Sequence, residues 1–230
     1  MRVRIALNCL AFALVFATPS AASEAPFTGE IFLIGVEDEV YTPTGCETFF
    51  VGSSSFRFWS RMQHDFAKRT TLKRGFGGAT IAEINHHFDK VVGRYRPKQV
   101  VFYAGENDTH RKNPVSEALA DFQTFLNKKN AVLTNTHVIF VSVKPSVARA
   151  ADFALQTKLN EEIARLADER DDHIYVDIVQ PMLRDGLPRS ELCISDNLHM
   201  NEMGYAIWTQ RINRALRDKK SRENTLCATQ

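Results

Sequence analysis

The chain has 230 residues, of which 44% are hydrophobic and 24% charged, and its 29 basic residues nearly balance its 27 acidic ones. This length and composition are typical of one folded domain with a sizeable core. The small net charge gives nucleic-acid binding no electrostatic support, so we expect no nucleic-acid partner.

The N-terminus has the pattern of a secretory leader. Two arginines precede an apolar run at residues 5–17, and small residues at 20–22 suit a signal peptidase. The run is too short to span a bilayer, and no second apolar stretch is long enough. We therefore expect a cleaved signal peptide at 1–22, a single domain without a membrane span at 23–230, and a periplasmic or secreted location.

Apolar runs alternate with segments of helical periodicity along the first half of the mature chain. Residues 48–51 predict a buried strand, and residues 56–67 predict a helix. The glycine-rich segment 73–80 is expected to form a loop that enters a helix. A second strand is predicted at 99–104, and a helix follows after Pro114.

The second half continues the alternation. A strand is predicted at 137–143, a helix from about residue 148 to 167, and another strand at 174–178. The last helix is expected to begin near Asn201, a residue type that caps helix N-termini well. Apolar strands that alternate with amphipathic helices indicate an α/β fold with a parallel sheet covered on both faces.

Ligands of such a sheet bind at the carboxyl ends of its strands, and polar segments stand at those positions. Gly52-Ser53-Ser54-Ser55 follows the first strand, and Gly105-Glu106-Asn107-Asp108 follows the second. Asp196-Asn197-Leu198-His199 leads into the last helix. Each segment alone is common in loops. Together with the glycine-rich segment, and in this order, they resemble the SGNH hydrolases, the GDSL lipase and esterase superfamily, from about Phe49 to Trp208.

The resemblance implies both a fold and a reaction. The fold is a three-layer α/β/α sandwich of flavodoxin-like type, with a central parallel sheet of about five strands. The reaction is the hydrolysis of a carboxylic ester or thioester, in a small molecule or on a glycan, without a metal or organic cofactor. The chain looks most like bacterial esterases whose first block is Gly-Ser-Ser-Ser and whose second is Arg-Gly-Phe-Gly-Gly. The oligomeric state stays open, with a monomer as the default.

The resemblance also implies a role for five residues. The nucleophile falls on Ser54, the general base on His199, and the carboxylate that orients it on Asp196. The oxyanion hole falls on the N–H groups of Ser54 and Gly78 and on the side-chain amide of Asn107. These types suit acyl transfer, because a serine needs a base to remove its proton and the developing oxyanion needs fixed donors.

Ser53 departs from the family pattern, since many members have aspartate there. This departure is the only support for a catalytically inactive protein. Three functions stay open, of which we favour an exported serine esterase. A carbohydrate O-deacetylase would use the same residues, and a catalytically inactive binding protein would keep only the fold. The nucleophile elbow of α/β-hydrolases is excluded, because Phe56 stands where its second glycine is required.

Other polar residues near these blocks have structural interpretations. Ser53 and Ser55 are expected to be turn or cap residues, Glu106 and Asp108 to make caps and turn hydrogen bonds, and His110 to lie in a loop that could border the substrate. Histidines elsewhere are expected to be structural, and no zinc-binding spacing is present.

Three cysteines follow the leader. Cys46 begins the first strand, at the sheet end opposite the candidate site, and the last helix runs back toward that end. This topology predicts a disulfide between Cys46 and Cys227 and leaves Cys193 as a reduced, mostly buried thiol.

Overall fold

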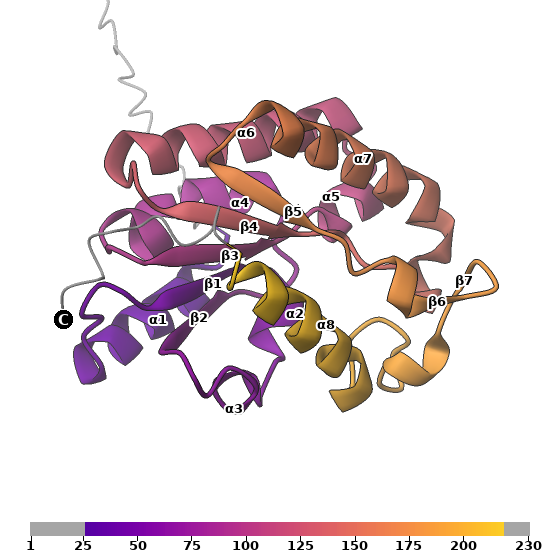
Figure 1. Ribbon diagram of the computed structural model, residues 1–230, viewed down its shortest axis with the longest axis horizontal. Coiled ribbons are helices and arrows are strands. Elements are labelled where there is room, and N and C mark those ends of the chain that lie inside the picture. The colour runs from indigo at the N-terminus through magenta and orange to yellow at the C-terminus, as the bar shows by residue number, and fades with distance from the viewer. Residues whose placement is uncertain (1–25, 219–230) are drawn as a thin grey trace, which may run out of the picture.

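A computed structural model describes residues 26–218. Its centre is a parallel sheet of five strands in the order β2-β1-β3-β4-β5 (Figure 1). The strands are β1 (Thr48–Gly52), β2 (Thr71–Gly75), β3 (Gln99–Tyr103), β4 (His137–Val141) and β5 (His173–Val176). The fold is therefore the α/β sandwich with a central parallel sheet that the sequence predicts, and β1 lies between β2 and β3.

Helices and short turns connect the strands. The α-helices are α1 (Thr28–Val40), α2 (Ser54–Arg57), α3 (Met62–Asp65), α4 (Ile81–His86), α5 (Glu106–His110), α6 (Val115–Val132), α7 (Phe153–Glu169) and α8 (Glu202–Ala215). A π-helical turn, η1, spans Asp89–Gly93, and 3₁₀ turns are η2 (Val147–Asp152), η3 (Gln180–Met182) and η4 (Ser190–Leu192). A small antiparallel hairpin pairs β6 (Leu183–Arg184) with β7 (Leu187–Pro188).

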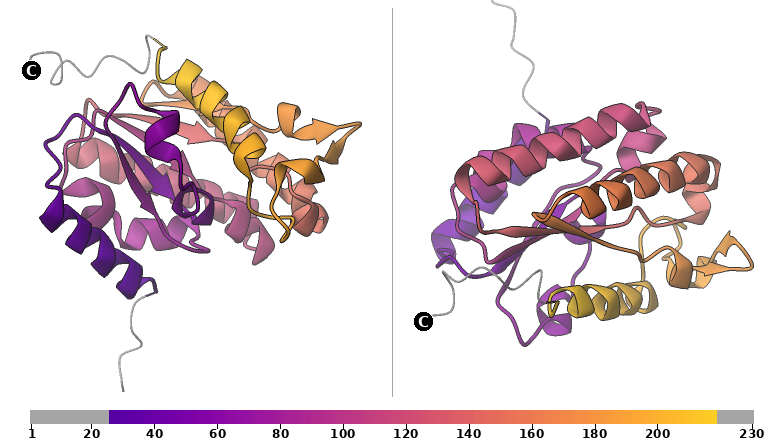
Figure 2. Two further views of the ribbon diagram at one scale, coloured as in Figure 1. Left: turned by 90° about the horizontal axis from the view of Figure 1, so that it is seen from below. Right: turned by 45° about the horizontal axis from the view of Figure 1, so that its top comes forward.

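An apolar layer covers each face of the sheet. Successive side chains along a strand point alternately into one layer and into the other. In β1, Phe49 and Val51 face the layer formed with α1, α4, α6 and α7, whereas Phe50 faces the layer formed with α2, α3 and α8. Figure 2 shows α6 and α7 on one side of the sheet and α8 on the other. Every residue of β1 and β3 is buried, as expected for strands covered on both faces.

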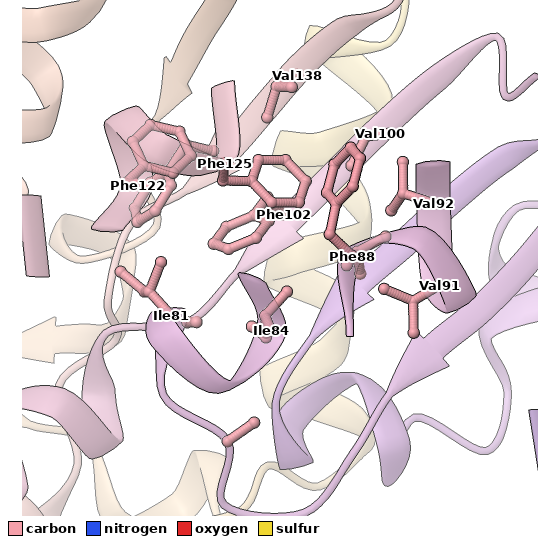
Figure 3. Close-up of a cluster of buried hydrophobic side chains, with 14 of the residues drawn as sticks. Ile81, Ile84, Phe88, Val91, Val92, Val100, Phe102, Phe122, Phe125 and Val138 are labelled. Atoms are coloured by element: carbon pink, nitrogen blue, oxygen red, sulfur yellow. The ribbon is translucent and has the colours of Figure 1, made fainter. Parts of the chain in front are cut away.

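Aromatic rings dominate the first of these layers. Phe102 of β3 packs against Phe122 and Phe125 of α6, with ring centroids 5.4 and 4.5 Å apart. Figure 3 shows these rings above Ile81 and Ile84 of α4. Because Ile81 is buried in this cluster, the start of α4 and the glycine loop before it are fixed to the core.

The last helix begins as predicted. The Asn201 side chain accepts hydrogen bonds from the N–H groups of Met203 and Gly204, at 3.0 and 3.2 Å, which caps the N-terminus of α8. Trp59 and Trp208 are both buried in the core.

The prediction of one continuous helix at 56–67 is wrong. The structure has two single-turn helices there, α2 and α3, joined by a non-helical link. Phe56, Trp59, Met62 and Phe66 are nevertheless all buried. The apolar spacing therefore identified the buried side chains correctly, although two short turns can present the same spacing as one helix.

Two elements were missed, and one begins later than expected. β2 overlaps the start of the predicted glycine-rich loop. The sequence does not indicate a strand there, because this edge strand is polar and only partly buried. α1 was not predicted, since only Ile31 and Ile34 of it are buried. The helix expected from residue 148 begins at Phe153, because 3₁₀ turn η2 precedes it and Arg149 has non-helical backbone angles.

Some expectations concern residues outside the described range. The leader at 1–22 and Cys227 are among them, so the bridge to Cys46 stays a prediction. Cys193 is a free thiol and is half-buried. Within residues 26–218, no helix has the length and apolar character needed to cross a membrane.

Candidate active site

Ser54 lies at the carboxyl end of β1, where the chain turns sharply into α2. The preceding residue, Ser53, is the N-cap and has extended backbone angles, φ −98° and ψ −160°. Glycine is required at position 52, because a Cβ there would lie 2.0 Å from the carbonyl oxygen of Tyr103 in β3. As the first residue of a helix, Ser54 has an N–H group without an intrahelical acceptor. The turn therefore presents both the hydroxyl and the N–H of Ser54.

A chain of hydrogen bonds links the hydroxyl, an imidazole and a carboxylate. His199 Nε2 lies 3.0 Å from Ser54 Oγ, and His199 Nδ1 lies 2.6 Å from Asp196 Oδ2. The other carboxylate oxygen of Asp196 accepts hydrogen bonds from the N–H groups of Leu198 and His199, each at 2.8 Å. This geometry allows His199 to receive the hydroxyl proton while Asp196 holds the ring in place.

The surroundings keep Asp196 ionised. Partial burial acts to raise the pKa of its carboxyl, but the hydrogen bonds from the His199 ring and from the two N–H groups outweigh burial and lower this pKa. The loop itself is fixed by a bond from the N–H of Ile194 to the carbonyl oxygen of His199 at 2.8 Å, and by another from the N–H of Ala148 to that of Asn197 at 3.1 Å. An ionised Asp196 stabilises the imidazolium that forms when His199 takes a proton.

The structure places the two other predicted oxyanion donors side by side, on the loop before α4 and on helix α5. Gly78 has φ +77°, a conformation that favours glycine, and an added Cβ would meet no atom within 4 Å. Backbone conformation, rather than lack of space, therefore requires glycine here. The Asn107 amide donates one hydrogen bond to the carbonyl oxygen of Ala79 at 3.1 Å. This bond positions the amide beside Gly78, and its second N–H remains for a ligand.

Three further residues hold this loop in place. Glu30 of α1 accepts the N–H of Gly77 at 3.1 Å and forms an ion pair with Arg57 at 2.7 Å. Arg111 donates to the carbonyl oxygen of Gly78 at 3.0 Å. Sequence reasoning missed Glu30 and Arg111: Glu30 lies outside the recognised blocks, and nothing in the pattern singles out Arg111.

Asp108 ties the same loop to the core. Its Oδ1 accepts the N–H of Ile81, the first residue of α4, at 3.1 Å. Its Oδ2 is buried without a hydrogen-bond partner among the described residues. Burial raises the pKa of Asp108 to about 6, although the hydrogen bond from Ile81 opposes the shift. The expectation of a cap or turn role is confirmed, since Asp108 binds the first N–H of α4.

The prediction for Glu106 is wrong. Glu106 forms a buried ion pair with Lys144, whose Nζ lies 2.9 Å from Oε1, and its Oε2 accepts the hydroxyl of Tyr103 at 2.9 Å. Burial, followed by the charge of Glu106, raises the pKa of Tyr103 well above its ordinary value. Lys144 lies just after the apolar strand β4, and a charged residue at this position is the sequence signal that could have identified the ion pair. The pair connects the helix that carries Asn107 to the end of the neighbouring strand.

The remaining polar residues lie around this centre. Ser53 Oγ is buried and has no hydrogen-bond partner in the described part of the chain, so it does not replace an aspartate. Ser55 anchors α8, since its carbonyl oxygen accepts the Tyr205 hydroxyl at 2.8 Å. His110 ends α5 rather than lying in a loop, and its Nδ1 lies 2.8 Å from Oδ2 of the buried Asp152.

Two further points concern the reactivity of Cys193 and the binding of metal ions. Burial raises the pKa of the Cys193 thiol, which disfavours the nucleophilic thiolate. In the part of the chain that the structure describes, no group of three or more histidine, cysteine, aspartate or glutamate side chains could hold a metal ion.

Comparisons with known proteins identify a family for this chain and structures that share its fold. Residues 43–207 match the model of the GDSL-like lipase/acylhydrolase family. A GDSL-like lipase from Bacteroides thetaiotaomicron is 20% identical, with a TM-score of 0.71, and the match covers 81% of this chain and 96% of that one. An acetylxylan esterase from Geobacillus stearothermophilus is 13% identical, with a TM-score of 0.60 and coverage of 77% and 97%. A family 3 carbohydrate esterase from Talaromyces cellulolyticus is 15% identical, with a TM-score of 0.61 and coverage of 74% and 96%. No curated protein sequence matches this chain.

Proposed function

Because this chain belongs to the GDSL-like lipase/acylhydrolase family and is a serine hydrolase, we propose that it is an exported esterase that works through an acyl-enzyme on Ser54. The observation that carries the proposal is the continuous hydrogen-bond chain from Ser54 Oγ to His199 Nε2 at 3.0 Å and from His199 Nδ1 to Asp196 at 2.6 Å. A binding protein that had lost turnover would have no need of this alignment.

The first half of the reaction forms the acyl-enzyme. Ser54 Oγ attacks the carbonyl carbon of the ester while His199 Nε2 takes the hydroxyl proton. The carbonyl oxygen becomes an anion, which the N–H groups of Ser54 and Gly78 and the amide of Asn107 stabilise. The C–O bond to the alcohol then breaks, and the imidazolium returns the proton to the leaving oxygen.

The second half repeats these steps with water. His199 takes a proton from the water as it attacks the acyl carbon, and the same donors stabilise the second oxyanion. The bond to Ser54 Oγ breaks, Oγ receives the proton, and the acid leaves. Asp196 stays ionised throughout and stabilises each imidazolium.

Covalent labelling tests the proposal against the inactive binding protein. A fluorophosphonate should label the wild-type chain at Ser54, and Ser54→Ala should abolish both labelling and hydrolysis of a short-chain nitrophenyl ester. Ser53→Ala is the matched control, because it removes the neighbouring hydroxyl and should still be labelled. Labelling elsewhere, or undiminished hydrolysis by folded Ser54→Ala, would refute the assignment.

Export is proposed from the leader pattern alone. The full-length chain, produced in a bacterium, should be recovered from the periplasm or the medium with an N-terminus near Ser23. Edman sequencing or intact mass of the exported protein measures this directly. An uncleaved chain retained in the cytoplasm would contradict export without affecting the esterase assignment.

The alcohol part of the substrate is the main alternative within this chemistry. Two structural neighbours are named as an acetylxylan esterase and a carbohydrate esterase, which keeps a carbohydrate O-deacetylase as the second candidate. Both candidates use the same catalytic groups. They differ in what must be held on the side of the site where the alcohol leaves.

A further inference from the structure

A pocket of about 550 Å³ opens beside His199, between the segment after α2 and the first turns of α8. Phe58, Ile194 and the His199 ring line its mouth, and Trp59, Met200 and Tyr205 line its interior. The last three are buried core residues, whereas Phe58 is 52% exposed and Ile194 48% exposed. Two large apolar side chains are thus held open to solvent next to the candidate catalytic imidazole.

The chemistry of the proposed reaction decides which part of an ester lies here. His199 Nε2 must return its proton to the leaving oxygen, so the alcohol has to leave on the imidazole side. The carbonyl oxygen must point toward the proposed donors Gly78 and Asn107, which lie on other segments than His199: the loop before α4 and helix α5. Resting on the proposed function, we propose that this pocket binds the alcohol part of the substrate, and that this alcohol is uncharged and apolar, alkyl or aryl, rather than a sugar.

The charged side chains of the pocket leave no free partner for a charged alcohol. Arg61 pairs with Glu202 at 3.0 Å across the far end. Asp65 accepts the indole N–H of Trp59 at 2.8 Å and contacts His64 at 3.3 Å. Arg61 and Glu202 therefore balance each other, and Asp65 is held by the Trp59 indole N–H, so a charged ligand would have to displace one of these contacts.

A sugar would also lack partners, because hydroxyl groups lose affinity when they are buried without hydrogen bonds. The Asn201 side chain is fully used: its oxygen caps α8, and its amide donates to the carbonyl oxygens of Glu191 and Cys193 at 2.8 and 3.2 Å. The Tyr205 hydroxyl is bonded to Ser55. Ser60 is the remaining uncharged polar side chain, and Arg61 and Glu202 are already paired with each other in an exposed position, which leaves few fixed partners for a polyol.

Phe58 connects the pocket to the reaction centre. Its ring meets the His199 ring edge to face, with centroids 4.6 Å apart. Its N–H donates to the carbonyl oxygen of Ser54 at 2.8 Å, so Phe58 stands one helical turn from the nucleophile. An apolar alcohol leaving along the imidazole would contact this exposed ring first.

The first test compares alcohols at constant acyl group. Acetates of 2-naphthylmethanol, ethanol and the 6-hydroxyl of glucose have leaving alcohols of similar basicity, so differences in kcat/KM report binding of the alcohol. We expect the naphthylmethyl ester to exceed both others by about tenfold or more, the scale that apolar pocket contacts reach. Equal values, or a preference for the sugar acetate, would overturn the proposal and leave the esterase function intact.

The second test fills the pocket. Ala206 lines it from the exposed side of α8, and Gln210 lies one turn further along the same helix outside it. Ala206→Trp should lower the naphthylmethyl-to-ethyl ratio of kcat/KM about tenfold, whereas the matched variant Gln210→Trp should keep the wild-type ratio. A ratio that Ala206→Trp leaves at the wild-type value refutes the assignment. Fluorophosphonate labelling of Ser54 in both variants separates this result from a failure of the proposed function.

Discussion

Glu30 of α1 accepts the N–H of Gly77 at 3.1 Å, one residue before the proposed oxyanion donor Gly78. The same carboxylate pairs with Arg57 of α2 at 2.7 Å. A helix from the N-terminal end of the described chain thus connects the loop that carries the proposed oxyanion donor Gly78 to the helix that begins with the proposed nucleophile Ser54.

Removing this carboxylate should impair turnover more than stability. We expect Glu30→Ala to lower kcat by about tenfold, a fraction of the 100- to 1,000-fold typical of losing an oxyanion donor outright, because Gly78 stays present but less well fixed. Glu30→Gln should recover part of the loss, since an amide oxygen can still accept the Gly77 N–H. Steady-state kinetics measures both, with Glu39→Ala as the control on the exposed side of the same helix. Equal kcat in the three variants would contradict a positioning role.

The Asn107 amide should matter chiefly in the transition state. Asn107→Ala removes a donor that faces the developing oxyanion and should lower kcat by about 100- to 1,000-fold with little change in KM. Because the amide also donates to Ala79, the melting temperature should be measured in parallel. A rise in KM at constant kcat would show that Asn107 only binds the substrate.

Asp108 should make stability depend on pH. Burial raises its folded-state pKa to about 6, above the ordinary value of 3.8, so the folded protein binds a proton that the unfolded chain has already lost between these pH values. Stability therefore falls as the pH rises from about 4 to 6, by on the order of 3 kcal/mol at most. Asp108→Asn removes this dependence, so its free energy of unfolding relative to the wild type should improve over the same interval. Urea unfolding at several pH values measures the difference, and a constant difference would contradict the assignment.

The buried pair of Glu106 and Lys144 should behave as a unit. Lys144 is fully buried and Glu106 nearly so. Removing one charge therefore leaves the other buried without its partner. We expect Glu106→Gln and Lys144→Met each to destabilise the fold by about 3–5 kcal/mol, and the double variant to cost clearly less than their sum. Chemical unfolding of the wild type, the two single variants and the double variant measures this coupling as a double-mutant cycle. Additive losses would mean that the two charges do not interact.

The sequence predicted the centre of this fold better than its edges. β1, β3 and β4 are apolar because helices cover both faces of the sheet, and β5, although it is an edge strand, is apolar enough to be predicted as well. β2 is an edge strand whose polar residues look like a loop. α1 buries only Ile31 and Ile34, so its periodicity is weak.

The same contrast applies to the site. The sequence proposes Ser54, Gly78, Asn107, Asp196 and His199 because their blocks follow one another in a recognisable order. Glu30 and Lys144 act through contacts between segments far apart in the chain, and no local pattern reveals such contacts. Lys144 reaches Glu106 because β3 pairs with β4, and this pairing brings together residues that are far apart in the sequence.

Direct observation of the acyl-enzyme tests the central claim most sharply. The protein would be mixed with a nitrophenyl acetate, quenched in acid within the first turnovers, digested, and analysed by mass spectrometry for acetylated peptides. Our account predicts one acetyl group on Ser54, absent from Ser54→Ala and formed far more slowly in His199→Ala, because His199 takes the Ser54 proton in the first step. Hydrolysis that proceeds at full rate with no acetyl group on Ser54 would contradict it.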